Sequence, residues 1–277
     1  MHIIKKAAAL AAALVLGLSL AACGREVTRE SDAFMDAVKE AYATTLGSGY
    51  PAYEYTTNAF MREGNIISYT DENFTSEVGV DVSEYSGTID WEALKAQGFQ
   101  FAFIRIGYRG YGEDGTLNLD PAYTENIQNA KAAGFEVGVY FFAQAINEEE
   151  AAEEAAFVLE QLGDTELDLP IVYDPENIEG TEARTDGLTR EQFTANTAAF
   201  CKAITDAGYD TAFYCNLTWQ TLHLNLSQLA DYPIWYADYS EKPQTPYMFE
   251  FWQYAESVTL DGIEGSFDLN IRLIPNE

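Results

Sequence analysis

The sequence predicts an α/β protein, an irregular TIM-like β/α barrel that follows an N-terminal signal and a spacer. From Val78 onward, short apolar runs of strand length alternate with longer stretches of helical periodicity, the pattern of βα units that build a parallel sheet. About five βα units are followed by three strand-like runs with little helix between them, which makes the predicted barrel irregular. The chain has 277 residues, 47% of them hydrophobic, and can bury one substantial core.

The N-terminus has the pattern of an export signal. Lys5 and Lys6 precede an apolar run over residues 7–22, which is too short to span a bilayer comfortably. The run ends in Leu-Ala-Ala-Cys-Gly, which resembles the lipobox of bacterial lipoproteins. We therefore expect residues 1–22 to be a lipoprotein signal peptide and Cys23 to carry a lipid anchor outside the cell. A plain secretory signal cleaved nearby is the alternative.

Residues 23–76 are expected to form a spacer with one helix, and residues 77–277 the barrel domain. Ser31 or Asp32 can cap a helix whose apolar residues recur every three to four positions, and Gly47 ends it. The expected role of the spacer is to lift the barrel domain off the membrane.

Within the barrel domain, apolar runs and helix-stop residues define the elements in order. The second helix ends at Gly134, the third keeps acidic residues on its solvent side, and the fourth places Phe193 and Phe200 on one face. The predicted strands are 78–82, 101–106, 136–142, 169–174 and 211–215, separated by helices 89–98, 121–133, 147–162 and 189–207 and followed by strands 233–237, 249–254 and 266–270.

Charge and histidine content argue against several classes of function. The formal net charge of −30 repels nucleic acid and anionic membranes, so we expect no nucleic-acid partner and membrane contact only through the lipid anchor. Beyond the signal, His223 is the single histidine, too few for a zinc hydrolase built on several His ligands. The sequence has no Gly-x-Ser-x-Gly motif, phosphate-binding loop or dinucleotide fingerprint. We expect a monomer without metal or cofactor that uses carboxylate chemistry.

Cys201 and Cys215 allow two interpretations. Export permits a disulfide between them, which would close a loop of about 15 residues. Both positions, one on a predicted helix and one on the next strand, also suit buried free thiols, which is the interpretation we favour.

The most informative motif is Asp174-Pro175-Glu176, two carboxylates separated by one residue where a predicted strand ends. Residues i and i+2 of an extended chain point the same way, with Cα atoms about 6.6 Å apart. Two acids this close do not both ionise cheaply, so one holds its proton nearer to neutral pH. Cleavage of a glycosidic bond needs that asymmetry, with one acid to protonate the leaving oxygen and one anion to support the developing cation. A strand that ends in a solvated acidic loop is the alternative.

Several short motifs follow one another along the predicted barrel domain. They are Gly79-Val-Asp81-Val-Ser83, Gly87-Thr-Ile-Asp90-Trp91, Phe101-Ala-Phe-Ile-Arg105, Gly134-Phe-Glu-Val-Gly-Val-Tyr140, Asp174-Pro-Glu176, Phe213-Tyr214, Pro233-Ile-Trp235, Trp252-Gln253-Tyr and Asp268-Leu-Asn270. Together they resemble glycoside hydrolase family 25, the lysozyme-like N-acetylmuramidases that cut peptidoglycan. The resemblance covers roughly residues 77–274, and its motifs stand in family order and at family spacing. It implies an irregular eight-stranded β/α barrel with five helices and an active site at the C-terminal strand ends.

The resemblance also implies catalytic roles. Glu176 is implied as the proton donor, with its pKa raised by Asp174 and by partial burial. Asp174 either attacks the anomeric carbon or orients the N-acetyl group of the substrate. Asp81 and Asp268 are implied as supporting acids that position the sugar and tune the pair. The structural alternatives are a capping or strand-end acid for Asp81 and a turn residue for Asp268.

Further strand-end residues are candidates for substrate binding. The cation among them either contacts substrate or neutralises the acids, and the aromatic side chains either stack on sugars or belong to the core. These candidates are Arg105, Tyr140, Tyr214, Trp235 and Trp252.

Two departures from the family pattern concern the same strand ends. Pro175 stands where the family more often has an apolar or aromatic residue, and it is tolerable because strand pairing ends there. Ser83-Glu84-Tyr85 replaces a His-containing segment of the family, which puts a His-assisted contact there in doubt.

The implied activity is that of a lysozyme or N-acetylmuramidase (EC 3.2.1.17) acting on peptidoglycan glycan strands at the β-1,4 bond between N-acetylmuramic acid and N-acetylglucosamine. The enzyme would be lipid-anchored on the extracellular face of the bacterial membrane. A non-catalytic glycan-binding lipoprotein on the same fold and a chitinase-like glycosidase are the alternatives.

Overall fold

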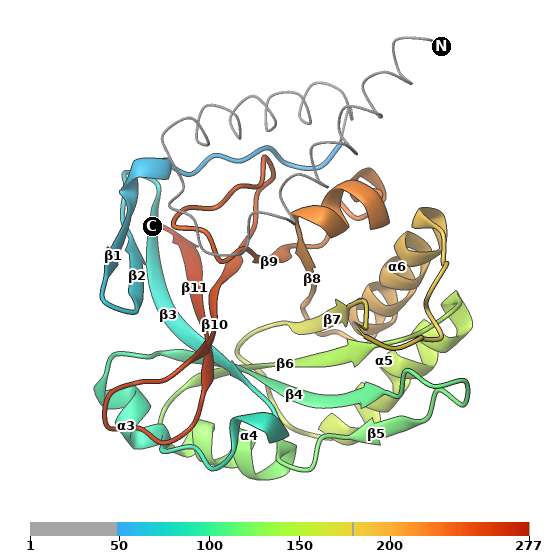
Figure 1. Cartoon of the computed structure of the whole chain (residues 1–277), viewed down its shortest axis with the longest axis horizontal. Helices are drawn as coiled ribbons and strands as arrows, with labels where there is room; N and C mark the ends of the chain where they lie inside the picture. The colour runs from blue at the N-terminus through green and yellow to red at the C-terminus, as the bar shows by residue number, and fades with distance from the viewer. Residues whose placement is uncertain (1–48, 179, 277) are drawn as a thin grey trace. The chain divides into compact units, whose positions relative to one another are not determined.

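The computed structural model describes residues 49–178 and 180–276 (Figure 1). These residues belong to one compact unit, and the description below concerns it. The predicted signal peptide, Cys23 and the predicted spacer helix lie outside the described residues. None of the helices within the described ranges is long and apolar enough to cross a membrane.

Eight strands close into a barrel. The strand order is β3-β11-β10-β9-β8-β7-β6-β4, and pairing of β4 with β3 completes the ring. β11 runs antiparallel to both of its neighbours, whereas the other neighbouring pairs of the ring run parallel. The strands are β3 (Phe74–Val82), β4 (Phe101–Arg109), β6 (Glu136–Ala143), β7 (Ile171–Pro175), β8 (Thr211–Asn216), β9 (Ile234–Ala237), β10 (Phe251–Val258) and β11 (Phe267–Pro275), with the short β5 (Leu117–Leu119) added to the end of β4.

Helices connect the first five barrel strands and lie outside the ring (Figure 1). They are α3 (Trp91–Ala96), α4 (Tyr123–Ala132), α5 (Glu148–Leu162) and α6 (Arg190–Asp206). The side chains of Asp90, Asn147 and Thr189 cap α3, α5 and α6 by accepting a backbone N–H of the first turn. After β8 the chain forms only a short π-helix (Trp219–His223) and a 3-10 turn (Leu226–Gln228), which confirms the predicted loss of helix there.

The barrel interior is a packed aromatic core. Phe103 of β4 stacks on Trp235 of β9 at 4.7 Å between ring centroids. Three strands separate β4 from β9 in either direction around the ring, so this contact crosses the interior. Gly79 and Gly138 make room for the rings, because a Cβ at either position would lie 2.6 Å from Phe101 or Phe103.

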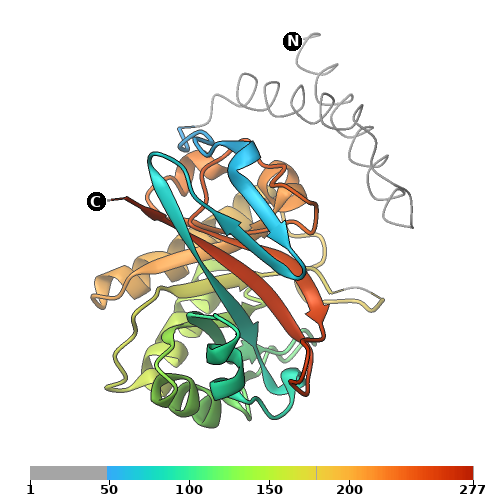
Figure 2. The same cartoon turned by 90° about the vertical axis from the view of Figure 1, so that its left-hand side faces the viewer.

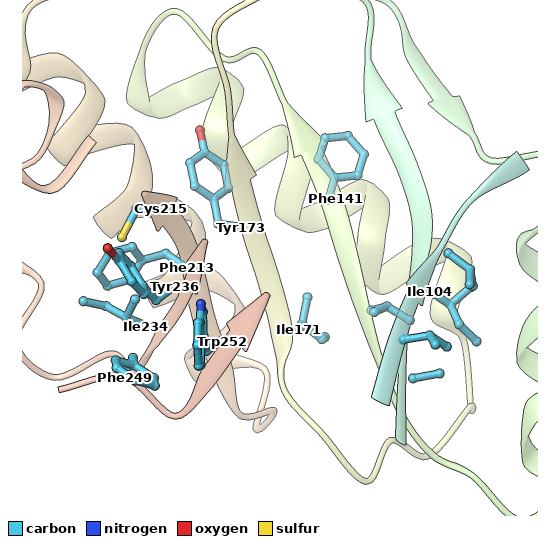
Figure 3. Packing of buried hydrophobic residues seen from close by; sticks show 14 of the residues in the cluster. Ile104, Phe141, Ile171, Tyr173, Phe213, Cys215, Ile234, Tyr236, Phe249 and Trp252 are labelled. Carbon is cyan, nitrogen blue, oxygen red and sulfur yellow. The ribbon is translucent and has the colours of Figure 1, made fainter. Parts of the chain in front are cut away.

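A second and larger core lies between the outer face of the barrel and its helices. Alternate residues of the same strands, such as Phe141, Tyr173 and Phe213, point outward into it (Figure 3). Cys201 of α6 and Cys215 of β8 are both buried there as free thiols, so the disulfide alternative is wrong.

Side chains of residues 50–74 belong to this core. The hairpin of β1 (Phe60–Glu63) and β2 (Ile66–Tyr69) packs beside β3 and β11 (Figure 2). The buried Phe60 ring meets Trp252 edge-on at 5.4 Å, and the Tyr55 hydroxyl donates to the backbone carbonyl of Phe249. The compact unit therefore begins well before residue 77, because these aromatic side chains cover the outer face of β10.

Candidate active site

Four carboxylates meet at one rim of the barrel. Asp81 and Asp174 are the penultimate residues of β3 and β7, and Glu176 follows β7 directly. Because β11 runs in the opposite direction, its second residue, Asp268, lies at the same rim and pairs in register with Asp81. The structure thus brings together the four acids that the sequence predicts at the strand ends.

The two most buried acids hold their protons strongly. Burial and the charge of Asp268 together raise the pKa of Asp81 to about 8, although two amide donors oppose the shift. Burial, then the charges of Glu176 and Asp81, raise the pKa of Asp174 well above its ordinary value, with Arg105 opposing. One oxygen of Asp174, Oδ1, is buried and has no hydrogen-bond partner among the described residues. This burial opposes the prediction that Asp174 is the ionised member of its pair in the free protein.

Glu176 is less deeply buried than Asp174, and its pKa lies near neutral pH. Burial, with the charges of Asp268 and Glu256, raises its pKa to about 7, and the Tyr214 hydroxyl beside it opposes the shift. The raised pKa agrees with a proton donor, but its causes are burial and these two acids more than the predicted effect of Asp174.

Two buried amides that the sequence interpretation left without a role hold Asp81. The Asp81 Oδ2 atom accepts from Gln253 Nε2 at 2.8 Å and from Asn270 Nδ2 at 2.7 Å. Gln253 of β10 and Asn270 of β11 face each other in register. The signal was present in the sequence, since Asn270 stands two residues after Asp268 and therefore on the same face of the strand.

Aromatic side chains fix the orientation of these amides. The Tyr214 and Tyr239 hydroxyls each donate to Gln253 Oε1 at 2.9 Å, which turns the Gln253 amide nitrogen toward Asp81. The Trp235 indole N–H donates to Asn270 Oδ1 at 2.8 Å. The arrangement supplies a connected set of donors under the acid cluster.

The aromatic candidates for sugar stacking separate into three groups. Tyr140 and Tyr214 line the interior just below the acids, 9% and 8% exposed, and pack edge-on against Trp235. Trp235 is 1% exposed, so it is a core residue that orients Asn270. Trp252 is fully buried on the outer face of the barrel, where its indole N–H donates to the Asp238 carbonyl, so its position agrees with the core alternative.

The Arg105 guanidinium is committed to other carboxylates. Nε donates to Asp120 at 2.7 Å and Nη2 to Glu84 at 3.0 Å. It also lies over the rings of Tyr85 and Tyr108 at 5.1 and 5.2 Å. These contacts favour a role in balancing charge beneath the rim over direct contact with substrate.

Exposed tyrosines stand in the loops that leave the strand ends. Tyr85 follows β3 and is 81% exposed, and Tyr239 follows β9 and is 48% exposed. The sequence interpretation gave neither a binding role, although the segment that contains Tyr85 directly follows the strand that carries Asp81. Large exposed rings near carboxylates are suited to contact sugar faces.

A family model for glycosyl hydrolases family 25 matches residues 80–263. The chain belongs to this family. The match includes Asp81, Asp174 and Glu176, and Asp268 lies just beyond it.

Two curated relatives of the family 25 chain are named as bacterial lysozymes. The autolytic lysozyme of Clostridium acetobutylicum is 26% identical over 193 residues, which cover 69% of this chain and 54% of the relative. Lysozyme M1 of Streptomyces globisporus is 29% identical over 204 residues, which cover 69% of this chain and 66% of the relative. The chain thus spans little more than half to two thirds of these proteins.

Solved structures share the fold of this family 25 chain. A family 25 glycosyl hydrolase from Bacillus anthracis superposes with a TM-score of 0.60 at 22% identity, covering 76% of this chain and 94% of that one. The modular autolysin LytC from Streptococcus pneumoniae, solved with a synthetic peptidoglycan ligand, gives 0.63 at 22% identity, covering 77% and 52%.

Proposed function

We propose that the protein is a muramidase that hydrolyses the β-1,4 bond between N-acetylmuramic acid and N-acetylglucosamine in peptidoglycan. The observation that carries the proposal is the convergence of Asp81, Asp174, Glu176 and Asp268 at one barrel rim, with the pKa of each raised chiefly by burial. Family membership, the names of the lysozyme relatives and the peptidoglycan ligand of LytC support the choice of substrate.

In this proposal Glu176 is the general acid. A carboxyl group with a pKa of about 7 is protonated over the acidic range and can donate to the glycosidic oxygen as the bond breaks. The leaving sugar takes this proton, and positive charge develops at the anomeric carbon of the other sugar. Carboxylates that are costly to ionise in the free protein become favourable beside that charge.

Asp174 serves the anomeric side of the reaction. It either attacks the anomeric carbon or orients the substrate N-acetyl group, which then attacks internally. Because burial raises its pKa, Asp174 must release its proton to solvent when substrate binds and act as the carboxylate. Water then adds to the anomeric carbon and gives its proton to Glu176, which restores the general acid. Asp81 is held by Gln253 and Asn270, and this fixed orientation suits a supporting acid better than an attacking one.

Analysis of the reducing ends released from purified peptidoglycan tests the function. We expect new muramic acid ends from the wild-type protein. Glu176→Gln removes the donated proton while keeping the side-chain shape, so release should fall by about a hundredfold or more with the thermal unfolding curve unchanged. Glucosamine ends would indicate the chitinase-like alternative, and binding without release would indicate a glycan-binding protein, and either result contradicts the proposal.

We also propose that the protein is exported and held at the outer face of the membrane by a lipid on Cys23. The relatives are lysozymes and autolysins, whose substrate lies outside the cell membrane. The sequence pattern before Cys23 supports the lipid.

A further inference from the structure

The proposed proton donor, Glu176, follows the last residue of β7 that is paired in the sheet. β7 ends at Pro175, which has no N–H to donate. Its pairing with β8 ends at Tyr173, and its pairing with β6 ends where Ala143 faces Pro175. Among the described residues no strand pairing reaches Glu176, so another contact must fix its backbone.

Gln144 makes that contact. It directly follows the last residue of β6 and is fully buried. Its Nε2 donates to the backbone carbonyl of Glu176 at 2.8 Å, which continues the β6–β7 pairing by one side-chain bond. Its Oε1 accepts from the Thr185 hydroxyl at 3.0 Å, and this second bond fixes which way the amide points.

A buried ion pair anchors Gln144 from the helix side. The Gln144 backbone N–H donates to Glu154 Oε1 at 3.1 Å, and Glu154 of α5 is fully buried. The same oxygen accepts from Arg109 Nε at 2.8 Å, and Arg109 in turn donates to the backbone carbonyls of Gly115 and Glu150. The anchor therefore connects β4, α5 and the end of β6, and it can move little.

We propose that Gln144 is a positioning residue for the proton donor: its side-chain amide holds the Glu176 backbone so that the carboxyl group is presented at the cleavage site. The role rests on the proposed muramidase function. Gln144 is fully buried and acts through its hydrogen bond to the Glu176 carbonyl, not through contact with substrate. Small displacements of a reacting group cost rate far more than binding.

The test compares Gln144→Leu with a matched control on a soluble peptidoglycan fragment. Gln144→Leu keeps the volume and removes both amide bonds, so we expect kcat to fall about tenfold, the value of one lost hydrogen bond, with KM unchanged. The control is Asn196→Leu. Asn196 is 1% exposed and donates to the carbonyl of Ala145, the residue next to Gln144, without contacting Glu176. It should lower thermal stability as much while keeping kcat within about twofold.

A second variant, Gln144→Glu, provides a readout that a purely structural role does not move. The new carboxyl group can donate to the Glu176 carbonyl only while it is protonated. It would face the charged groups Glu154, Arg109 and Glu176, all within the network described above. The activity of this variant relative to wild type should therefore rise as pH is lowered, whereas the relative activity of Gln144→Leu should stay constant.

Two results would overturn the positioning role in an active wild-type protein. One is a Gln144→Leu variant whose kcat falls no more than that of Asn196→Leu. The other, which decides the matter if Gln144→Leu does not fold, is a relative activity of Gln144→Glu that does not change with pH. A wild-type protein that releases no reducing ends would instead overturn the proposed function, and the role with it.

Discussion

At the scale of single residues, burial and hydrogen bonding have opposite effects on the pKa values of the acids. Two amide donors favour the ionised form of Asp81, yet burial and Asp268 still raise its pKa to about 8. The folded protein thus keeps an acid in a place that is costly for its charge. Such a cost is expected where charge is needed only during reaction.

This cost predicts a trade between stability and function at Asp81. Folded Asp81 binds its proton more tightly than unfolded Asp81, so between pH 3.8 and about 8 the folded state holds more protons and the free energy of unfolding falls as pH rises. Asp81→Asn removes the charge but keeps an oxygen for Gln253 and Asn270. At pH 8 the variant should be more stable than wild type by at least ~1.4 kcal/mol, the equivalent of one pKa unit, while losing activity.

Urea unfolding of both proteins at pH 5 and pH 8 checks this prediction. The gain should shrink at pH 5, where Asp81 of the wild-type protein is already protonated. If Asp81→Asn were instead less stable than wild type by the same amount at pH 5 and pH 8, the Asp81 side chain would stabilise the fold and its charge would carry no penalty.

Sequence alone identified the acids but not their electrostatic order. Spacing places Asp174 and Glu176 on one side of a strand, whereas the pKa of each depends on burial in the folded barrel and on neighbours from distant strands, such as Asp81 and Tyr214. The same limit applies to Trp252. Alternation along a strand gives two faces, but the sequence does not say that residues 50–69 would cover the outer one.

At the scale of elements, the reversed strand β11 completes the site. The sequence predicts strands near residues 233–237, 249–254 and 266–270, and the structure confirms strands at these places. The sequence does not predict whether these strands run parallel or antiparallel to their neighbours. Only the antiparallel course of β11 brings Asp268 to the rim where the parallel strands end. The hairpin of β1 and β2 has a comparable structural role on the outer face, where it closes the core around Trp252.

The hairpin should therefore contribute to the stability of the barrel. Phe60 is 6% exposed, so Phe60→Ala should lower the free energy of unfolding by about 3 kcal/mol, the usual cost of removing a buried aromatic ring. The neighbouring Met61 is 64% exposed, and Met61→Ala should change it by less than ~0.5 kcal/mol. Urea denaturation measures both. Equal, small effects would show that the hairpin is an appendage, as the predicted spacer implies.

At the scale of the whole molecule, a net charge of −30 surrounds a rim that already carries four acids. The field of the protein does not attract an anionic cell wall, so under the proposed function recognition would be local, at the rim. A lipid anchor would compensate by holding the enzyme close to its substrate. One or two acyl chains raise the local concentration without any contact with the site.

Loss of the proposed lipid anchor should change where the protein is found and leave its catalysis unchanged. Cys23→Ala should move the protein from the membrane fraction to the soluble exported fraction, because the acylated residue is gone. Its specific activity on a soluble peptidoglycan fragment should equal that of the wild-type protein. Mass spectrometry of the wild-type N-terminus provides the control, and an N-terminus without acyl groups would contradict the anchor.

The central claim is that the fold keeps Glu176 protonated near neutral pH so that it can donate. Carbon-13 NMR of Glu-labelled protein, with the Glu176 carboxyl signal assigned by its absence in Glu176→Gln, measures that protonation directly. The account predicts a titration midpoint for Glu176 near 7. A midpoint near the ordinary value of 4.5 would contradict it, because Glu176 would then be ionised over most of the range in which it must act as an acid.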